Sequence, residues 1–217
     1  VVTKHQHTGE IFGYVSVFKP RWADPDALNE VLYSCENVIS LPPADRWKLV
    51  SKRYGIPQDW HEATANGWLS DNGISLHHPD GKVVFGIGIT TDKNFQGLGV
   101  VDMTLNKALR LAKESGAKFF MAFSRLPSYQ EYETSYGKIS LDEYVHLVKG
   151  DVPYDYGFRF HWKAGAQPAC TKSGKISYVG IPAAMKDDSE SNNAGVLIIN
   201  PLTFGGSYPI SHLSGKL

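Results

Sequence analysis

The sequence lacks several features that would point to common classes of protein. Its 217 residues include only two cysteines, Cys35 and Cys170, far apart and in no metal-binding spacing, so we expect reduced thiols in a cytoplasmic protein. Lysine plus arginine equals aspartate plus glutamate at 22 each, and this balance disfavours a broad nucleic-acid or anionic-membrane surface. No apolar run reaches the roughly 18 residues of a membrane span, and no histidine or cysteine pattern meets a four-ligand metal requirement.

Two nucleotide-binding fingerprints are also missing. Neither G-x-G-x-x-G after a strand nor G-x-x-x-x-G-K-[ST] occurs, so dinucleotide and nucleoside triphosphate sites lack support.

The chain starts at Val1 without a signal-peptide pattern. We expect a single domain, residues 1–217, cut from a longer protein.

What the chain does contain is enough apolar sequence for one substantial core, because 42% of its residues are hydrophobic and 12% aromatic. Alternation and helical spacing predict the elements of one α/β domain. Strands are expected at 10–18, 117–124 and 195–202, and a hairpin at 74–90 turning at 79–81. Helices are expected at 24–38, 43–54, 99–115, 140–150 (with a Ser140–Glu143 capping box and Gly150 as its stop) and 155–165.

A glycine loop, Gln96-Gly97-Leu98-Gly99, leads directly into the predicted helix 99–115. Glycines at this place remove side chains, so backbone N–H groups can approach a ligand closely. The N-terminus of a helix also favours an anion. The loop therefore predicts an anion-binding site.

The loop resembles the Gln/Arg-x-x-Gly-x-Gly/Ala motif of the GCN5-related N-acetyltransferase (GNAT) superfamily, with Val101 where glycine or alanine is usual. "VVFGIGITT" before the loop and "FRFHWKAGA" after it are similar to two further family motifs. The resemblance covers about residues 70–201 and implies an α+β three-layer fold of the α/β class. Its mixed, mostly antiparallel central sheet would be splayed between strands four and five. Residues 70–201 would form the acyl-CoA-binding core and residues 1–70 the acceptor side.

The resemblance also implies the ligand, a coenzyme A thioester (acetyl-CoA or malonyl-CoA) bound as substrate without a metal. The loop would cradle the pyrophosphate, and the pantetheine arm would pair with residues 87–91 beside residues 120–124. The N–H of Ile89 would polarise the thioester carbonyl. The implied contacts are Ile89, Thr90, Thr91, Gln96, Gly97, Leu98, Gly99, Val100 and Val101.

His161 is the first candidate for a catalytic group. It stands four positions before Gly165, where many family members carry a tyrosine that protonates the leaving thiolate. A histidine pKa near neutrality would suit both giving and taking a proton. The alternative is a partly buried helical histidine bonded to a carbonyl group, and the family position favours the catalytic role.

Ser124 and Arg125 would face the acyl end of the bound thioester. Ser124 would hydrogen-bond an acyl carbonyl or carboxylate, and Arg125 would pair with a carboxylate through two hydrogen bonds. The alternatives are a loop-capping hydroxyl and a solvated charge. Thr90 and Thr91 would reach the same place, although strand propensity alone also explains them.

Two features of the sequence concern the acceptor side: a strand without a carboxylate, and a tryptophan. The strand "VVFGIGITT" has no acid before Asp92, which suits a thiol acceptor better than an ammonium group, although Glu62 or Asp71 would supply a base from elsewhere. Trp22 would close the acceptor pocket against amines, or would be a hydrophobic staple on the first helix.

Histidine in the proton-donor position and a tryptophan near the acceptor resemble a narrower group, the GNAT-like loading-module domains of polyketide synthases of the curacin type. This likeness implies decarboxylation of malonyl-type thioesters and loading of the acyl group on an acyl carrier protein, beside neighbouring domains of a larger synthase. Two alternatives stay open: an N-acetyltransferase acting on an amine, and a non-catalytic acyl-CoA-binding module.

Overall fold

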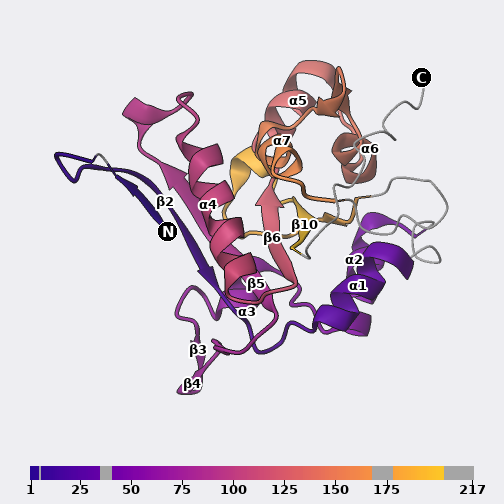
Figure 1. The fold of residues 1–217 in the computed structure, drawn as a ribbon. Coiled ribbons are helices and arrows are strands. Elements are labelled where there is room, and N and C mark those ends of the chain that lie inside the picture. The colour runs from indigo at the N-terminus through magenta and orange to yellow at the C-terminus, as the bar shows by residue number, and fades with distance from the viewer. Residues whose placement is uncertain (5, 35–40, 168–177, 203–217) are drawn as a thin grey trace.

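The computed structural model describes residues 1–4, 6–34, 41–167 and 178–202; Cys35 and Cys170 lie outside these ranges. A six-stranded sheet in the order β1-β2-β5-β6-β10-β9 forms the centre (Figure 1). Its strands are β1 (Val2–Lys4), β2 (Ile11–Phe18), β5 (Val83–Thr91), β6 (Phe119–Arg125), β9 (Gly180–Ile181) and β10 (Gly195–Pro201). β5 and β6 run parallel, and the other neighbouring pairs are antiparallel. The expected mixed, mostly antiparallel sheet is confirmed.

Helices cover both faces of the sheet and produce the expected three layers. One face packs against α1 (Pro25–Ser34), α2 (Pro43–Tyr54) and α3 (Trp60–Thr64) in a core that includes Leu32, Trp47 and Phe85. The other packs against α4 (Val100–Glu114), α5 (Tyr129–Tyr136), α6 (Leu141–Val145) and α7 (Tyr156–Lys163) in a core that includes Leu105, Phe120 and Phe158. The smaller elements are β3 (Ser70–Asp71), β4 (Ile74–Ser75), β7 (Val148–Lys149), β8 (Val152–Pro153) and the 3-10 helices η2 (Lys93–Phe95) and η3 (Ser189–Ser191).

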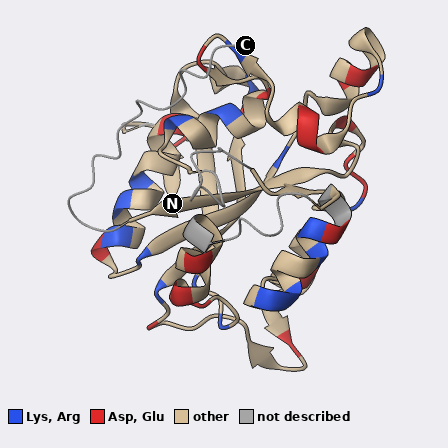
Figure 2. Cartoon of the chain, turned by 90° about the vertical axis from the view of Figure 1, so that its right-hand side faces the viewer, with Lys and Arg blue, Asp and Glu red and all other residues tan. Residues whose placement is uncertain are grey.

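The surface carries both signs of charge. In the view of Figure 2, basic and acidic residues are interspersed along the helices. In the described part of the chain, no helix has the length and apolar character needed to cross a membrane.

The two central strands separate half-way along their length. β5 pairs with β6 only from Val83–Phe119 to Gly86–Ala122. On its other edge β5 pairs with β2 as far as Thr91, but Ile87 is an extra residue with no partner in β2. Such a β-bulge bends the strand that carries it. The remaining part of β5, residues 87–91, therefore diverges from β6, and the splay expected between these strands is confirmed.

Most locally encoded elements are confirmed, among them α2, α4, β10 and the Ser140–Glu143 capping box. The helix expected at 24–38 is confirmed as far as Ser34, and its last residues lie outside the described ranges.

The hairpin expected at 74–90 is wrong. Residues 74–75 pair with β3, and β5 pairs with β2 and β6 instead. The predicted turn itself is present, with the Gly81 N–H donating to the His78 carbonyl at 2.9 Å. The local pattern does not reveal the long-range partner of this segment. His77 forms a β-bridge with Pro20, which lies just after the end of β2.

Gly150 does not end a helix. α6 is only five residues long and closes at His146, whose Nδ1 lies 2.6 Å from the Asp142 carbonyl. Gly150, with φ at 63°, instead forms the turn between β7 and β8. Gly150 is therefore a turn residue with a left-handed backbone, but it belongs to the β7–β8 turn and not to the end of α6.

The N-terminus of α7 lies tightly against the end of β6. A Cβ atom at Gly157 would come within 2.7 Å of Pro127 Cδ and 2.8 Å of the Arg125 carbonyl, whereas one at Gly88 would meet nothing within 4 Å. We expect Gly157→Ala to lower the free energy of unfolding by about 1–3 kcal/mol, the usual cost of overpacking. Gly88→Ala is the matched control and should leave it nearly unchanged. Urea denaturation measures both, and equal midpoints for the two variants would contradict this packing.

Candidate active site

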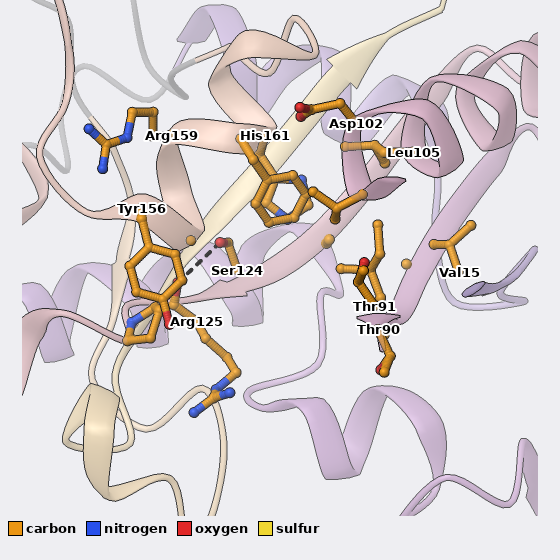
Figure 3. Close-up of a pocket in the computed structure, with 18 of the residues that line it drawn as sticks. Val15, Thr90, Thr91, Asp102, Leu105, Ser124, Arg125, Tyr156, Arg159 and His161 are labelled. Carbon is orange, nitrogen blue, oxygen red and sulfur yellow. Dashed lines mark hydrogen bonds between the residues drawn. The ribbon is translucent and has the colours of Figure 1, made fainter. Parts of the chain in front are cut away.

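A cavity of about 960 Å³ occupies the splay between β5 and β6 (Figure 3). Its lining includes Trp60 and Phe123 from the core beside α1–α3, and Leu105 and Phe120 from the core beside α4–α7. Because both faces of the sheet contribute, the cavity passes through the sheet where the strands part. Residues from both faces of the sheet therefore border one cavity.

The glycine loop lines the mouth of this cavity on the α4 side. Gly97 and Gly99 have φ values of 78° and 76°, a conformation that favours glycine. Gly99 is the residue before α4, which begins without a side-chain cap, so its first N–H groups remain available to an anion. Of the predicted contacts, Gln96, Gly97, Gly99, Val100 and Val101 line the cavity. Leu98 is 71% exposed and is not among the described lining residues.

The register of the sheet directs backbone groups of β5 into the splay. Val15 exchanges two hydrogen bonds of 2.9 Å with Val1, so its N–H and carbonyl both point away from β5. Val15 is the partner of Ile89, which makes this a non-hydrogen-bonded pair of the antiparallel ladder. The N–H and carbonyl of Ile89 consequently face the opposite edge, where β6 has already diverged.

Thr90 and Thr91 both line the cavity beside Ile89 (Figure 3). The Thr91 Oγ1 is buried and has no hydrogen-bond partner among the described residues. A buried hydroxyl without a partner is costly, and a polar group of a ligand would satisfy it.

His161 lies in the wall of the cavity and is held there by α7. Asp155 caps this helix by accepting a hydrogen bond from the Phe158 N–H at 3.1 Å, and the Tyr144 hydroxyl donates to the same carboxylate at 2.9 Å. The His161 side chain is buried, and its Nδ1 has no partner among the described residues.

Burial also sets the protonation state of this histidine. Desolvation lowers the pKa of His161 from 6.5 to about 3, because the charged imidazolium is disfavoured away from water. The expectation of a pKa near neutrality is therefore wrong for the free protein, in which His161 is neutral at physiological pH.

Ser124 is brought into the same cavity as His161 (Figure 3). Its side chain is buried, and its Oγ donates to the Arg125 carbonyl at 3.2 Å. The Arg125 guanidinium also lies at the cavity, but it pairs with Asp188 and, at 3.0 Å, with Glu190. The hydrogen bond to Asp188 raises the pKa of Arg125 above its usual value. A substrate carboxylate would have to compete with these two acids.

The tryptophan at the cavity is Trp60 and not Trp22. Trp22 packs edge-on against Phe85, with ring centroids 5.5 Å apart, and is not among the described residues that line the cavity. Trp60 does line it, and its indole N–H donates to the Ile87 carbonyl at 2.7 Å.

Trp60 was not predicted, because no element is expected from the sequence between the helix at 43–54 and the hairpin at 74–90. Asp59 accepts a hydrogen bond from the Glu62 N–H at 2.8 Å and caps α3. The pattern D-x-x-E was therefore the signal that would have revealed the helix. His61, on the same helix, and Tyr156 and Arg159, at the start of α7, also line the cavity without having been predicted.

Two exposed histidines, His7 and His77, and the two acids named from the sequence as possible bases are not among the described lining residues. His5 is outside the described residues, His7 is exposed, and the His77 Nδ1 accepts from the Lys19 N–H at 3.3 Å. Neither Glu62 nor Asp71 is among the described lining residues. Within the described ranges, no three histidine, cysteine, aspartate or glutamate side chains gather into a potential metal site.

The splayed mixed sheet with a glycine loop at the head of α4 defines a GNAT-like fold. No protein-family model and no curated protein matches the chain, but solved structures do. The GNAT-like decarboxylase GphF in complex with isobutyryl-CoA matches with a TM-score of 0.59 and 20% identity, over 93% of this chain and 77% of that one. The loading GNATL domain of CurA from Lyngbya majuscula matches with a TM-score of 0.55 and 16% identity, over 91% and 74%.

A third solved structure is malonyl-CoA decarboxylase from Rhodopseudomonas palustris, with a TM-score of 0.53 and 12% identity, over 89% of this chain and 44% of that one. The resemblance expected from the sequence is thus confirmed at the level of the fold.

The glycine loop provides one test of the site. We expect Gly97→Val to abolish coenzyme A binding, because valine disfavours the left-handed backbone that turns the N–H groups toward the ligand. Gly73→Val is the matched control, since Gly73 also has φ at 78° and open space around it but lies in the β3–β4 turn. Calorimetric titration with coenzyme A measures both. Unchanged affinity in Gly97→Val, or equal loss in the two variants, would remove the loop from the site.

Burial of His161 provides a second test. The unfolded chain takes up a proton at this residue as the pH falls below 6.5, whereas the folded protein does not do so until about pH 3. This histidine should therefore lower the free energy of unfolding as the pH falls through that window. Urea denaturation at about pH 4.5 and about pH 7.5 should show a smaller pH dependence in His161→Gln than in the wild type, with His77→Gln as a control for removing a histidine. Equal pH dependence in wild type and His161→Gln would mean that His161 is not buried as described.

Proposed function

We propose that this protein is an acyl-CoA-dependent enzyme that decarboxylates malonyl-type coenzyme A thioesters and loads the resulting acetyl or other acyl group on an acyl carrier protein thiol, in polyketide chain initiation. One observation carries the proposal. A cavity through the sheet combines a glycine loop for the pyrophosphate, an outward Ile89 N–H, and Ser124 and His161 on its wall. The fold likeness to a GNAT-like decarboxylase and to a synthase loading domain supports it.

The substrate would lie along β5. Its pyrophosphate would accept hydrogen bonds from the N–H groups of residues 97–101, and its pantetheine amides would pair with the free backbone of Ile89 and Thr91. This arrangement directs the thioester carbonyl toward the N–H of Ile89. A fixed donor stabilises negative charge that develops on that oxygen.

Decarboxylation needs that charge stabilisation. The bond between the α carbon and the carboxylate breaks, carbon dioxide leaves, and the electron pair forms an enolate whose oxygen the Ile89 N–H holds. Ser124 would orient the leaving carboxylate by a hydrogen bond. Arg125 is already paired with Asp188 and Glu190. We therefore propose that Arg125 holds the segment around Asp188 beside the cavity and does not bind the substrate.

His161 would then protonate the enolate carbon. It is neutral in the free protein, but the malonyl carboxylate would bring a negative charge into the same buried space, and an opposite charge favours the imidazolium. Substrate binding would thus be coupled to proton uptake. The proton moves to the α carbon as carbon dioxide leaves, and His161 returns to its neutral form.

The acceptor would reach the thioester from the α3 side. A carrier-protein thiol is acidic enough to need less help than an amine, and the described part of β5 offers no carboxylate in the cavity. In this proposal residues 1–70 form the acceptor side of one domain in a larger cytoplasmic synthase, and residues 70–201 bind the thioester.

Parallel incubations distinguish this function from its alternatives. With malonyl-CoA, the proposed enzyme releases carbon dioxide. With acetyl-CoA and amines, an N-acetyltransferase would release coenzyme A only when an amine is present. A binding module would bind the thioesters in a titration and turn over neither. The absence of carbon dioxide release would overturn the proposal.

Replacement of His161 tests the catalytic assignment. We expect His161→Ala and His161→Gln to lower the rate of malonyl-CoA decarboxylation by roughly a hundred- to ten-thousand-fold, the usual contribution of a positioned acid or base. The loss should appear in the rate and not in the affinity for coenzyme A. His77→Gln serves as the control. Rates within about threefold of the wild type in both His161 variants, far below the usual effect, would make His161 a structural residue.

A further inference from the structure

The cavity has a second histidine, on the side of the sheet opposite to His161. His61 follows Trp60 in α3 and lines the cavity. Trp60 is fixed at two points: its backbone N–H donates to the Ala184 carbonyl at 2.9 Å, and its indole donates to the Ile87 carbonyl at 2.7 Å. His61 is therefore held at the wall beside the bulge of β5.

The two ring nitrogens of His61 have different surroundings. Nδ1 is buried without a hydrogen bond, and Asp59 Oδ1 lies 4.0 Å from it. That oxygen is itself fixed, because it accepts from the Glu62 N–H at 2.8 Å. Nε2 has no hydrogen bond among the described residues and is not buried, in a side chain that is 25% exposed.

The carboxylate decides which nitrogen is free to act as a base. A lone pair on the buried Nδ1 would face the negative charge of Asp59 with no donor between them, whereas an N–H at Nδ1 is attracted to it. The favoured neutral tautomer therefore carries its proton on Nδ1. The lone pair is then on Nε2, the nitrogen that is not buried, in a residue that lines the cavity.

We propose that His61 is the base that accepts the proton of the acceptor thiol in acyl transfer, with Asp59 as a positioning residue. This inference rests on the proposed function, whose acceptor enters from the α3 side. It also supplies the base that β5 does not carry among its described residues. His61 and His161 would then serve opposite ends of one reaction, the first at the incoming thiol and the second at the acyl group.

In the acyl-transfer step one carbon–sulfur bond forms and one breaks. The S–H proton of the acceptor moves to His61 Nε2, and the thiolate sulfur forms a bond to the thioester carbon. The oxyanion of the tetrahedral intermediate is held by the Ile89 N–H. The bond from that carbon to the coenzyme A sulfur then breaks, and the coenzyme A thiolate leaves and is protonated by solvent, to which His61 also returns its proton.

Two acceptors of different acidity test this role, with acetyl-CoA as the donor so that transfer is measured without decarboxylation. N-acetylcysteamine is an alkyl thiol and is mostly protonated at neutral pH. Thiophenol is more acidic and is largely ionised, so it needs no base. We expect His61→Gln to lower transfer to N-acetylcysteamine by roughly a hundred- to ten-thousand-fold, and transfer to thiophenol by at least tenfold less.

Asp59→Asn keeps a capping side chain on α3 and removes the charge that orients His61. It should lower alkyl transfer in the same selective way, by a smaller factor. His77→Gln, an exposed histidine, controls for the loss of an imidazole.

Two outcomes overturn the inference. One is an equal loss with both thiols in His61→Gln, which would indicate a structural role. The other is a wild-type protein that transfers acetyl to neither thiol. Failure of the proposed function would be seen separately, as wild-type protein that releases no carbon dioxide from malonyl-CoA. The selective loss with acetyl-CoA would still establish His61 as the base in that case.

Discussion

The hydrogen bond from the Trp60 indole to the Ile87 carbonyl, at 2.7 Å, stabilises the feature on which the whole site depends. Ile87 is the extra residue of the β5 bulge, so neither β2 nor β6 supplies a ladder partner for it. The Trp60 indole N–H gives the Ile87 carbonyl the hydrogen bond that the ladder does not. With that carbonyl bonded, β5 diverges from β6 after Gly86. The divergence opens the sheet, frees the Ile89 N–H and connects the α4–α7 side to the α3 side.

The chemistry depends on the burial of His161 in this opening as much as on the groups that line it. Burial keeps His161 neutral in the free protein, so the cavity does not hold an uncompensated charge at that residue before the substrate arrives. The Asp155 carboxylate caps α7 and accepts a hydrogen bond from the Tyr144 hydroxyl. It thereby fixes the helix that carries His161, although Asp155 is not among the described lining residues of the cavity. An anionic acyl group would then be the charge that changes the protonation of the site.

The sequence predicted those parts of the molecule whose causes are local. The glycine loop, the capping box at Ser140 and the buried strand at β10 depend on neighbouring residues, and each is present. The hairpin at 74–90 failed because β5 pairs with residues of β2 that lie 67 to 78 positions earlier, from Phe18 with Phe85 to Gly13 with Thr91. No local pattern encodes that partner. Trp22 and Trp60 are alike in sequence terms, and only the packing of α3 shows which of them reaches the cavity. The low pKa of His161 likewise arises from burial, which a single sequence does not reveal.

The central claim is that this cavity decarboxylates a malonyl thioester and protonates the enolate on the enzyme. Incubation of the protein with malonyl-CoA in deuterated water, followed by mass spectrometry of the thioester, tests it most directly. The account predicts acetyl-CoA with deuterium from solvent in its methyl group, formed only when active protein is present. Malonyl-CoA recovered intact from protein that binds it would contradict the account.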